Sequence, residues 1–139
     1  MGDATGGIDS VELHNNVFYA TNGAADVLSD ADAVWIAGRQ VAGTNNWVQS
    51  GATEVPGEWT GTVTGTSPGF AGAPANLTPT STSALRDAGG PATAFPAGHQ
   101  FPNPVTTLPQ FVPPAQTTEA SATARPSNGT IDIGAYEFQ

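Results

Sequence analysis

The sequence predicts an all-β fold in which short strands stack as a solenoid, and three observations support this prediction. Between residues 8 and 70, apolar runs of strand length alternate with turns rich in Gly, Asn, Asp and Ser. The one helix candidate, residues 24–33, has apolar side chains too sparse for an amphipathic stripe, so a turn or a brief helical turn is expected there. Two strand-forming pairs, each preceded by two asparagines, lie thirty residues apart, within the ~20–50-residue period of repeat architectures.

Length and charge restrict the function classes. The 139 residues suit one domain, and three basic against twelve acidic residues give a net charge of −9 without any lysine. Arg39, Arg86 and Arg125 cannot form the basic patch that nucleic acids need, and no apolar run has the ~18 residues of a membrane span. The absence of cysteine excludes disulfides and thiolate metal sites.

The composition also bears on location. Residues 1–7 are small and polar, unlike a signal peptide, and are expected to be disordered or a start segment ahead of the domain. The acidity, the scarcity of basic residues and the many Thr, Ser, Asn and Gly residues resemble a secreted or surface protein from a bacterium. The sequence therefore predicts an extracellular protein, although the chain as given lacks a signal peptide.

The expected strands follow in order along residues 8–70. Apolar and polar residues alternate over 10–14, so Val11 and Leu13 should face inward. Residues 17–19 continue as strand, and 33–37 form a second apolar run in which Trp35 is expected to be core. Residues 47–48 and 60–64 complete the set.

The asparagine repeat predicts a specific contact. Asn15-Asn16 precedes Val-Phe, and Asn45-Asn46 precedes Trp-Val. Asparagine adopts the left-handed backbone region at little cost, and stacked asparagine amides form ladders. Asn16 and Asn46 should therefore lie on successive turns of the solenoid, near left-handed angles and with bonded amides. The alternative is a chance recurrence of Asn-Asn in two turns.

The remaining chain divides into two sections. Residues 71–128 hold most of the prolines, which preclude long strands, and are expected to form an extended strap. Its large apolar side chains should be buried; they are Phe95, Phe101, Leu108 and Phe111. Residues 129–139 alternate like a one-face-buried strand, in which Asp132 and Gly134 are expected to have structural roles. The prediction is a single domain over 8–139, with turns in 8–70, the strap in 71–128 and a closing strand in 129–139.

Three segments resemble a known family. Residues 125–137 read Arg-Pro-Ser-Asn-Gly-Thr-Ile-Asp-Ile-Gly-Ala-Tyr-Glu, residues 67–70 read Ser-Pro-Gly-Phe, and 77–89 contain Leu-Thr-Pro and Asp-Ala-Gly. This pattern is similar to the C-terminal part of bacterial right-handed parallel β-helix proteins, secreted and pectate-lyase-like, often of the choice-of-anchor type. The resemblance implies an end fragment of two to three turns with a strap and a closing strand. The family's lyases use a Lys or Arg base with a calcium cluster; no matching motif occurs here, so no catalytic position is carried over.

One set of residues could carry catalysis. Ser10, Glu12 and His14 occupy alternate positions of a strand and should share an exposed face. A histidine beside a carboxylate can act as a general base or as part of a metal site. The alternative is that the three are solvated residues of the outer face.

Two further sets could bind ligands. Asp26, Asp30 and Asp32 offer the oxygen ligands that calcium prefers, without the spacing of an EF-hand, and otherwise form an acidic turn. Calcium is the one cofactor that these residues suggest. Trp59, Tyr19 and Trp47 could stack on sugar rings, and Trp59, which follows Pro-Gly-Glu, is expected to be the most exposed of them.

Two classes of function follow from these patterns. The first is a non-catalytic, structural or carbohydrate-contacting C-terminal module of a secreted β-helix protein, with polysaccharide as its partner. The alternative is a small hydrolase of glycoside or ester bonds that uses His14 with Glu12 or a carboxylate-bound metal. An open first turn also predicts self-association into a symmetric dimer through Val11, Leu13 and the strand around Trp35.

Overall fold

The computed structural model describes residues 7–8, 10–30, 35–36, 38–91 and 129–138, and these residues form β-structure without a helix. The chain divides into two compact units, residues 1–68 and 69–139, close to the predicted end of the turns at residue 70. The strands are short; they are β1 (Val11–His14), β2 (Val17–Phe18), β3 (Val41–Thr44), β4 (Trp47–Gln49), β5 (Val63–Gly65), β6 (Phe70–Gly72) and β7 (Asn76–Pro79). The all-β prediction is confirmed for the described residues.

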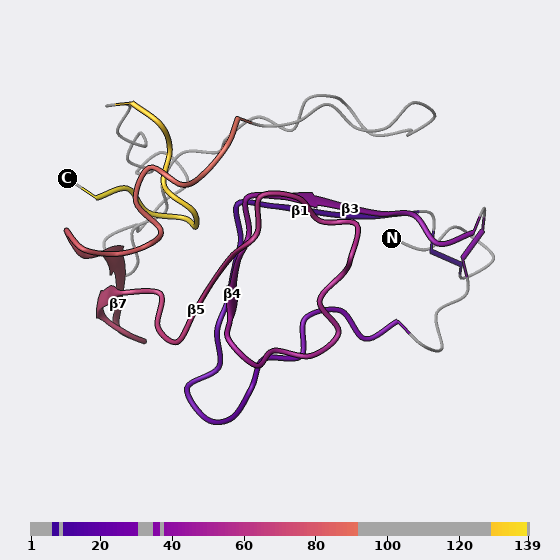
Figure 1. The fold of residues 1–139 in the computed structure, drawn as a ribbon, viewed down its shortest axis with the longest axis horizontal. Helices are drawn as coiled ribbons and strands as arrows, with labels where there is room; N and C mark the ends of the chain where they lie inside the picture. Colours follow the sequence, from indigo (N-terminus) through magenta and orange to yellow (C-terminus); the bar gives the residue numbers. More distant parts are fainter. Residues whose placement is uncertain (1–6, 9, 31–34, 37, 92–128, 139) are drawn as a thin grey trace, which may run out of the picture. The chain divides into compact units, whose positions relative to one another are not determined.

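The strands of the first unit pair in parallel. β1 pairs with β3, and β4 lies between β2 and β5 in a second sheet. Val11 is opposite Val41 and Val17 is opposite Trp47, so the thirty-residue repeat in the sequence is also the register of the β1–β3 and β2–β4 pairs. Figure 1 shows the result, with successive passes of the chain lying along one another at β1 and β3 and at β4 and β5.

A left-handed residue forms the corner between the two sheets in each pass. Asn15 has φ 57°, Asn45 has φ 52° and Gly61 has φ 65°. The Asn15 N–H donates to the Thr44 carbonyl at 3.0 Å, and the Asn45 N–H donates to the Thr60 carbonyl at 3.0 Å, so the three corners are in register. Each position is occupied by asparagine or glycine, the residues that adopt this conformation most readily.

The asparagine contact forms as predicted, but its backbone geometry differs. Asn16 Nδ2 lies 3.4 Å from Asn46 Oδ1, and the Asn16 N–H donates to the same oxygen at 2.9 Å. The prediction of left-handed angles at these two residues is wrong, because the first asparagine of each pair makes the corner. The second asparagine can therefore turn its amide inward, and Asn46 is fully buried.

The core of the first unit surrounds β4, the central strand of its sheet. Trp47 and Val48 are buried, and Trp59 is 8% exposed, with its ring centroid 5.3 Å from that of Phe18. The indole of Trp59 lies against Gly43 of β3, where a Cβ would come within 2.5 Å of Trp59 Nε1. Glycine at this position is therefore a packing requirement.

Isolated bridges extend the parallel pairing beyond the strands. Ile8 bridges to Trp35 and Asp26 bridges to Thr53, both in parallel, and the Val27 N–H donates to the Thr53 carbonyl at 3.1 Å. Residues 24–30 form no helix, in agreement with the turn expected there. Trp35 is only half-buried, so its assignment to the core is wrong: it contributes a parallel bridge to Ile8.

The second unit contains an antiparallel hairpin that the sequence did not predict. β6 and β7 pair with Phe70 opposite Pro79 and Gly72 opposite Asn76. The hairpin covers the start of the predicted strap, before most of its prolines. The strap side chains expected to be buried lie outside the described residues; they are Phe95, Phe101, Leu108 and Phe111.

The predicted closing strand does not form in residues 129–138. Gly129 has φ 141° and Gly134 has φ 105°, so the backbone bends instead of continuing as a strand. The Asp132 carboxylate accepts hydrogen bonds of 2.7 Å from the N–H groups of Asp87 and Phe138. The segment is thus held by a carboxylate and bent back on itself, and a ladder is not needed to satisfy its amides.

Candidate functional site

The first candidate site is the outer face of β1. Glu12 and His14 are two residues apart in the strand, so their side chains share a face. His14 Nε2 lies 3.4 Å from Glu12 Oε2. The prediction of a solvent-exposed face is wrong, because the Glu12 side chain is only 8% exposed and that of His14 only 20%.

Thr44 completes this group, and the sequence reasoning missed it. Thr44 lies opposite His14 in the parallel register, and its Oγ1 is 2.9 Å from His14 Nδ1. The thirty-residue repeat contains the signal that could have identified Thr44, since adding thirty to 14 gives the facing residue. We call Glu12, His14 and Thr44 the β1–β3 polar cluster.

For a neutral His14 beside an ionised Glu12, the two contacts select one tautomer of the imidazole. An ionised carboxylate only accepts hydrogen bonds, so Nε2 carries the proton toward Glu12 and Nδ1 accepts from the Thr44 hydroxyl. A hydroxyl nucleophile, an imidazole as its general base and a carboxylate that orients the imidazole are arranged in this order in catalytic triads. Ser10 lies one residue before β1, half-buried.

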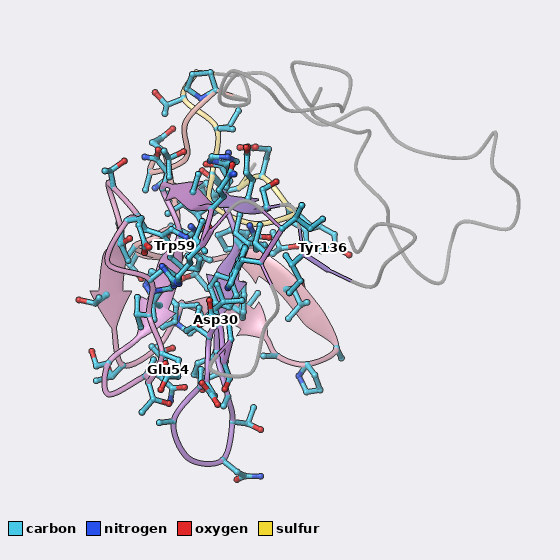
Figure 2. The ribbon with its side chains drawn as sticks, turned by 90° about the vertical axis from the view of Figure 1, so that its right-hand side faces the viewer. Asp30, Glu54, Trp59 and Tyr136 are labelled. Atoms are coloured by element: carbon cyan, nitrogen blue, oxygen red, sulfur yellow. The ribbon has the colours of Figure 1, made fainter. Side chains whose placement is uncertain are left out.

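The aromatic residues chosen for sugar contact differ in exposure. Trp59 was expected to be the most exposed, yet it and Trp47 are buried and cannot offer a ring face to a ligand. Figure 2 labels Trp59, which belongs to the buried core of the first unit. Tyr19 is 37% exposed and meets Trp47 edge-on with the ring centroids 6.2 Å apart. Of the three, Tyr19 alone offers a ring to solvent.

The acidic residues proposed for calcium lie in different surroundings, and the calcium site stays a prediction. Asp30 Oδ2 accepts a hydrogen bond of 2.9 Å from Arg39 Nε, and Arg39 Nη1 also contacts Glu58. A guanidinium already neutralises the Asp30 carboxylate, which Figure 2 labels. Asp26 is exposed, and Asp32 lies outside the described residues. Across the described part of the chain, His, Asp and Glu form no group of three that could hold a metal ion.

Asp132 is a buried, hydrogen-bonded residue of the second unit, and Gly134 lies close to it with φ 105°. Asp132 and Glu137 are each 3% exposed, and the Asp132 N–H donates to Glu137 Oε2 at 3.0 Å. Ile133 is buried, and its N–H donates to the Leu85 carbonyl at 2.9 Å. Hydrogen bonds between carboxylates and backbone amides therefore hold this end of the second unit in place.

Comparison with protein-family models, curated proteins and solved structures finds no match to this chain. The resemblance to β-helix proteins therefore stays a prediction. In the ranges that the structure describes, no helix has the length and hydropathy to cross a membrane.

The surface expected to self-associate also remains a prediction. Val11 and Leu13 are half-buried and face Val41 and Gly43 of β3. Trp35 is half-buried and bridges to Ile8. These contacts are within one chain and do not test a dimer.

Proposed function

We propose that this chain is a non-catalytic structural module, the end part of a right-handed parallel β-helix in a secreted bacterial protein, and that its outer surface contacts polysaccharide. The observation that carries the proposal is the register of the first unit. The chain returns to pair in parallel with itself at β1–β3, at β2–β4 and at the bridge from Asp26 to Thr53. Repeated parallel stacking of one chain on itself is typical of solenoids.

The inner contacts support a structural role. Asn16 and Asn46 join successive passes, and Trp47 and Val48 fill the interior beside them. The β1–β3 polar cluster also fits this role, because both nitrogens of His14 are engaged and the side chain is mostly buried. A cluster of this kind ties two passes of the chain together.

Tyr19 supports carbohydrate contact. Its ring is held against Trp47, and it is more than a third exposed. An exposed aromatic ring with few degrees of freedom binds the CH face of a sugar at low entropic cost. The chain's negative charge favours neutral polysaccharides over acidic ones.

The test is binding and turnover of a panel of neutral and acidic polysaccharides by the full chain, with and without calcium. We expect the protein to bind a neutral polysaccharide without cleaving it, and we expect Tyr19→Ala to lose that binding. Ile36→Ala is the matched control, since Ile36 is an exposed apolar residue outside the proposed contact. Failure of every polymer to bind, or equal loss in both variants, would contradict carbohydrate contact.

A second function is favoured by one observation, the order of groups in the β1–β3 polar cluster. Hydrolysis of an ester or a glycoside would use His14 as the base, Glu12 to orient it and Thr44 as the hydroxyl. Turnover of an ester or glycan that His14→Ala abolishes, without a change in melting temperature, would replace the structural proposal with this one.

A further inference from the structure

We propose that Asn22 is a site of spontaneous deamidation in the folded protein, with Gly23 as the attacking residue and water as the co-reactant. The two residues lie in a bend of the first unit after Tyr19, and both are exposed. An asparagine followed by glycine is the dipeptide in which the next backbone nitrogen reaches the side-chain amide most easily, since glycine has no side chain to obstruct it. The inference is independent of the proposed function.

The structure leaves the reacting groups accessible. Within the described residues, neither the Asn22 side chain nor the Gly23 N–H makes a hydrogen bond; Gly23 is held only through its carbonyl. A Cβ placed on Gly23 would meet nothing within 4 Å, so the backbone has room to move toward the amide. Gly23 has φ 84°, and no strand ladder restrains it.

The asparagines of the two Asn-Asn pairs differ from Asn22, because the backbone nitrogens that would attack them are already hydrogen-bonded. Attack on Asn15 would need the Asn16 nitrogen, which donates to Asn46 Oδ1 at 2.9 Å. Attack on Asn46 would need the Trp47 nitrogen, which donates to the Asn16 carbonyl at 2.8 Å. The same fold that protects these residues therefore leaves Asn22 reactive.

The reaction balances with water alone. The Gly23 nitrogen forms a bond to Asn22 Cγ, its proton is transferred through solvent to Nδ2, and the Cγ–Nδ2 bond breaks to release ammonia. One water molecule then opens the cyclic imide at either carbonyl and gives aspartate or isoaspartate. No group is oxidised or reduced, and the chain gains one negative charge.

The isoaspartate product would open a specific contact. Gln49 Oε1 accepts from the Ala20 N–H at 3.0 Å, and Gln49 Nε2 donates to the Gly23 carbonyl at 3.2 Å; we name this pair of bonds the Gln49 clip. Isoaspartate adds a methylene to the backbone between positions 22 and 23. The carbonyl of Gly23 then moves relative to the N–H of Ala20, and Gln49 cannot keep both bonds. The modification would thus release the loop that follows Tyr19.

The experiment compares deamidation rates in the folded and urea-unfolded full chain at mildly alkaline pH, by peptide mapping with mass spectrometry. We expect Asn22 to react at nearly the same rate in both states, while Asn15 and Asn46 react at least about tenfold more slowly in the folded state, as amides in stable structure are protected. Gly23→Val should slow the reaction at Asn22 in both states. Protection of Asn22 by folding as large as that of Asn15 would overturn the proposal, as would reaction at Asn22 that Gly23→Val does not change.

Discussion

Replacing Asn46 with alanine should destabilise the first unit far more than its small volume suggests. Asn46 is fully buried, its Oδ1 accepts from the Asn16 N–H at 2.9 Å, and its Nδ2 donates to the Leu13 carbonyl at 2.8 Å. Asn46→Ala removes the acceptor of the Asn16 N–H and a side-chain donor to the Leu13 carbonyl. The loss of each bond costs about 1–3 kcal/mol, so the free energy of unfolding should fall by roughly 2–6 kcal/mol.

Urea unfolding followed by tryptophan fluorescence measures this loss directly. All three tryptophans of the chain precede residue 69, so the signal reports on the first unit. Asn22→Ala is the matched control, since the Asn22 side chain is exposed and outside the ladder, and its effect should stay within about 0.5 kcal/mol. Asn46→Asp keeps the acceptor but loses the donor to Leu13, so it should also be destabilising.

The reasoning fails if Asn46→Ala and Asn22→Ala have the same midpoint and slope. That result would mean that the stacking of the passes depends on the apolar side chains alone. An intermediate result, in which only Asn46→Asp is destabilising, would assign the effect to the buried charge and would equally contradict the ladder.

Three other substitutions test separate contacts. Gly43→Ala places a methyl group against the Trp59 indole and should cost about 1–3 kcal/mol or more in urea unfolding; an effect below about 0.5 kcal/mol would contradict the packing. Asp132→Asn replaces a charged acceptor by a neutral one and should speed hydrogen exchange of the Asp87 and Phe138 amides by about fivefold, because bonds to charged groups are stronger by ~1 kcal/mol; unchanged exchange would contradict it. Arg39→Gln should cost under about 1 kcal/mol, since its ion pairs are partly exposed; a loss above about 2 kcal/mol would show a larger role than screening allows.

Local patterns predicted β1, β2 and β4 of the first unit and the thirty-residue parallel register, but not β3, over residues 41–44. The alternation over residues 10–14 became β1, and the pair of asparagine repeats gave the offset between β1 and β3. This worked because a parallel stack repeats the same environment, so the sequence repeats with it. The prediction placed the left-handed angle one residue too late, because either asparagine of a pair could make the corner and local composition does not distinguish them.

Side-chain burial was harder to predict than strand position. Trp59 follows a turn, and its depth depends on the space that Gly43 leaves on a different strand. Thr44 joined His14 only through the register, since nothing next to His14 in the sequence indicates it. The closing segment alternates like a strand, but the Asp132 carboxylate satisfies amides that are far apart in the sequence, and alternation carries no information about such a partner.

The corners of the first unit are unequally spaced along the sequence. Val17 and Trp47 are thirty residues apart, whereas Trp47 and Val63, which are paired in the same way, are only sixteen apart. The alignment of one pass on the next is therefore set at the corner, and the number of residues in the loop between two corners is free to vary. Loop closure becomes only slowly more costly with length, by about 0.6 kcal/mol for each doubling. Insertions or grafted peptides in these loops should be tolerated, so that the same row of corners can carry loops of very different size.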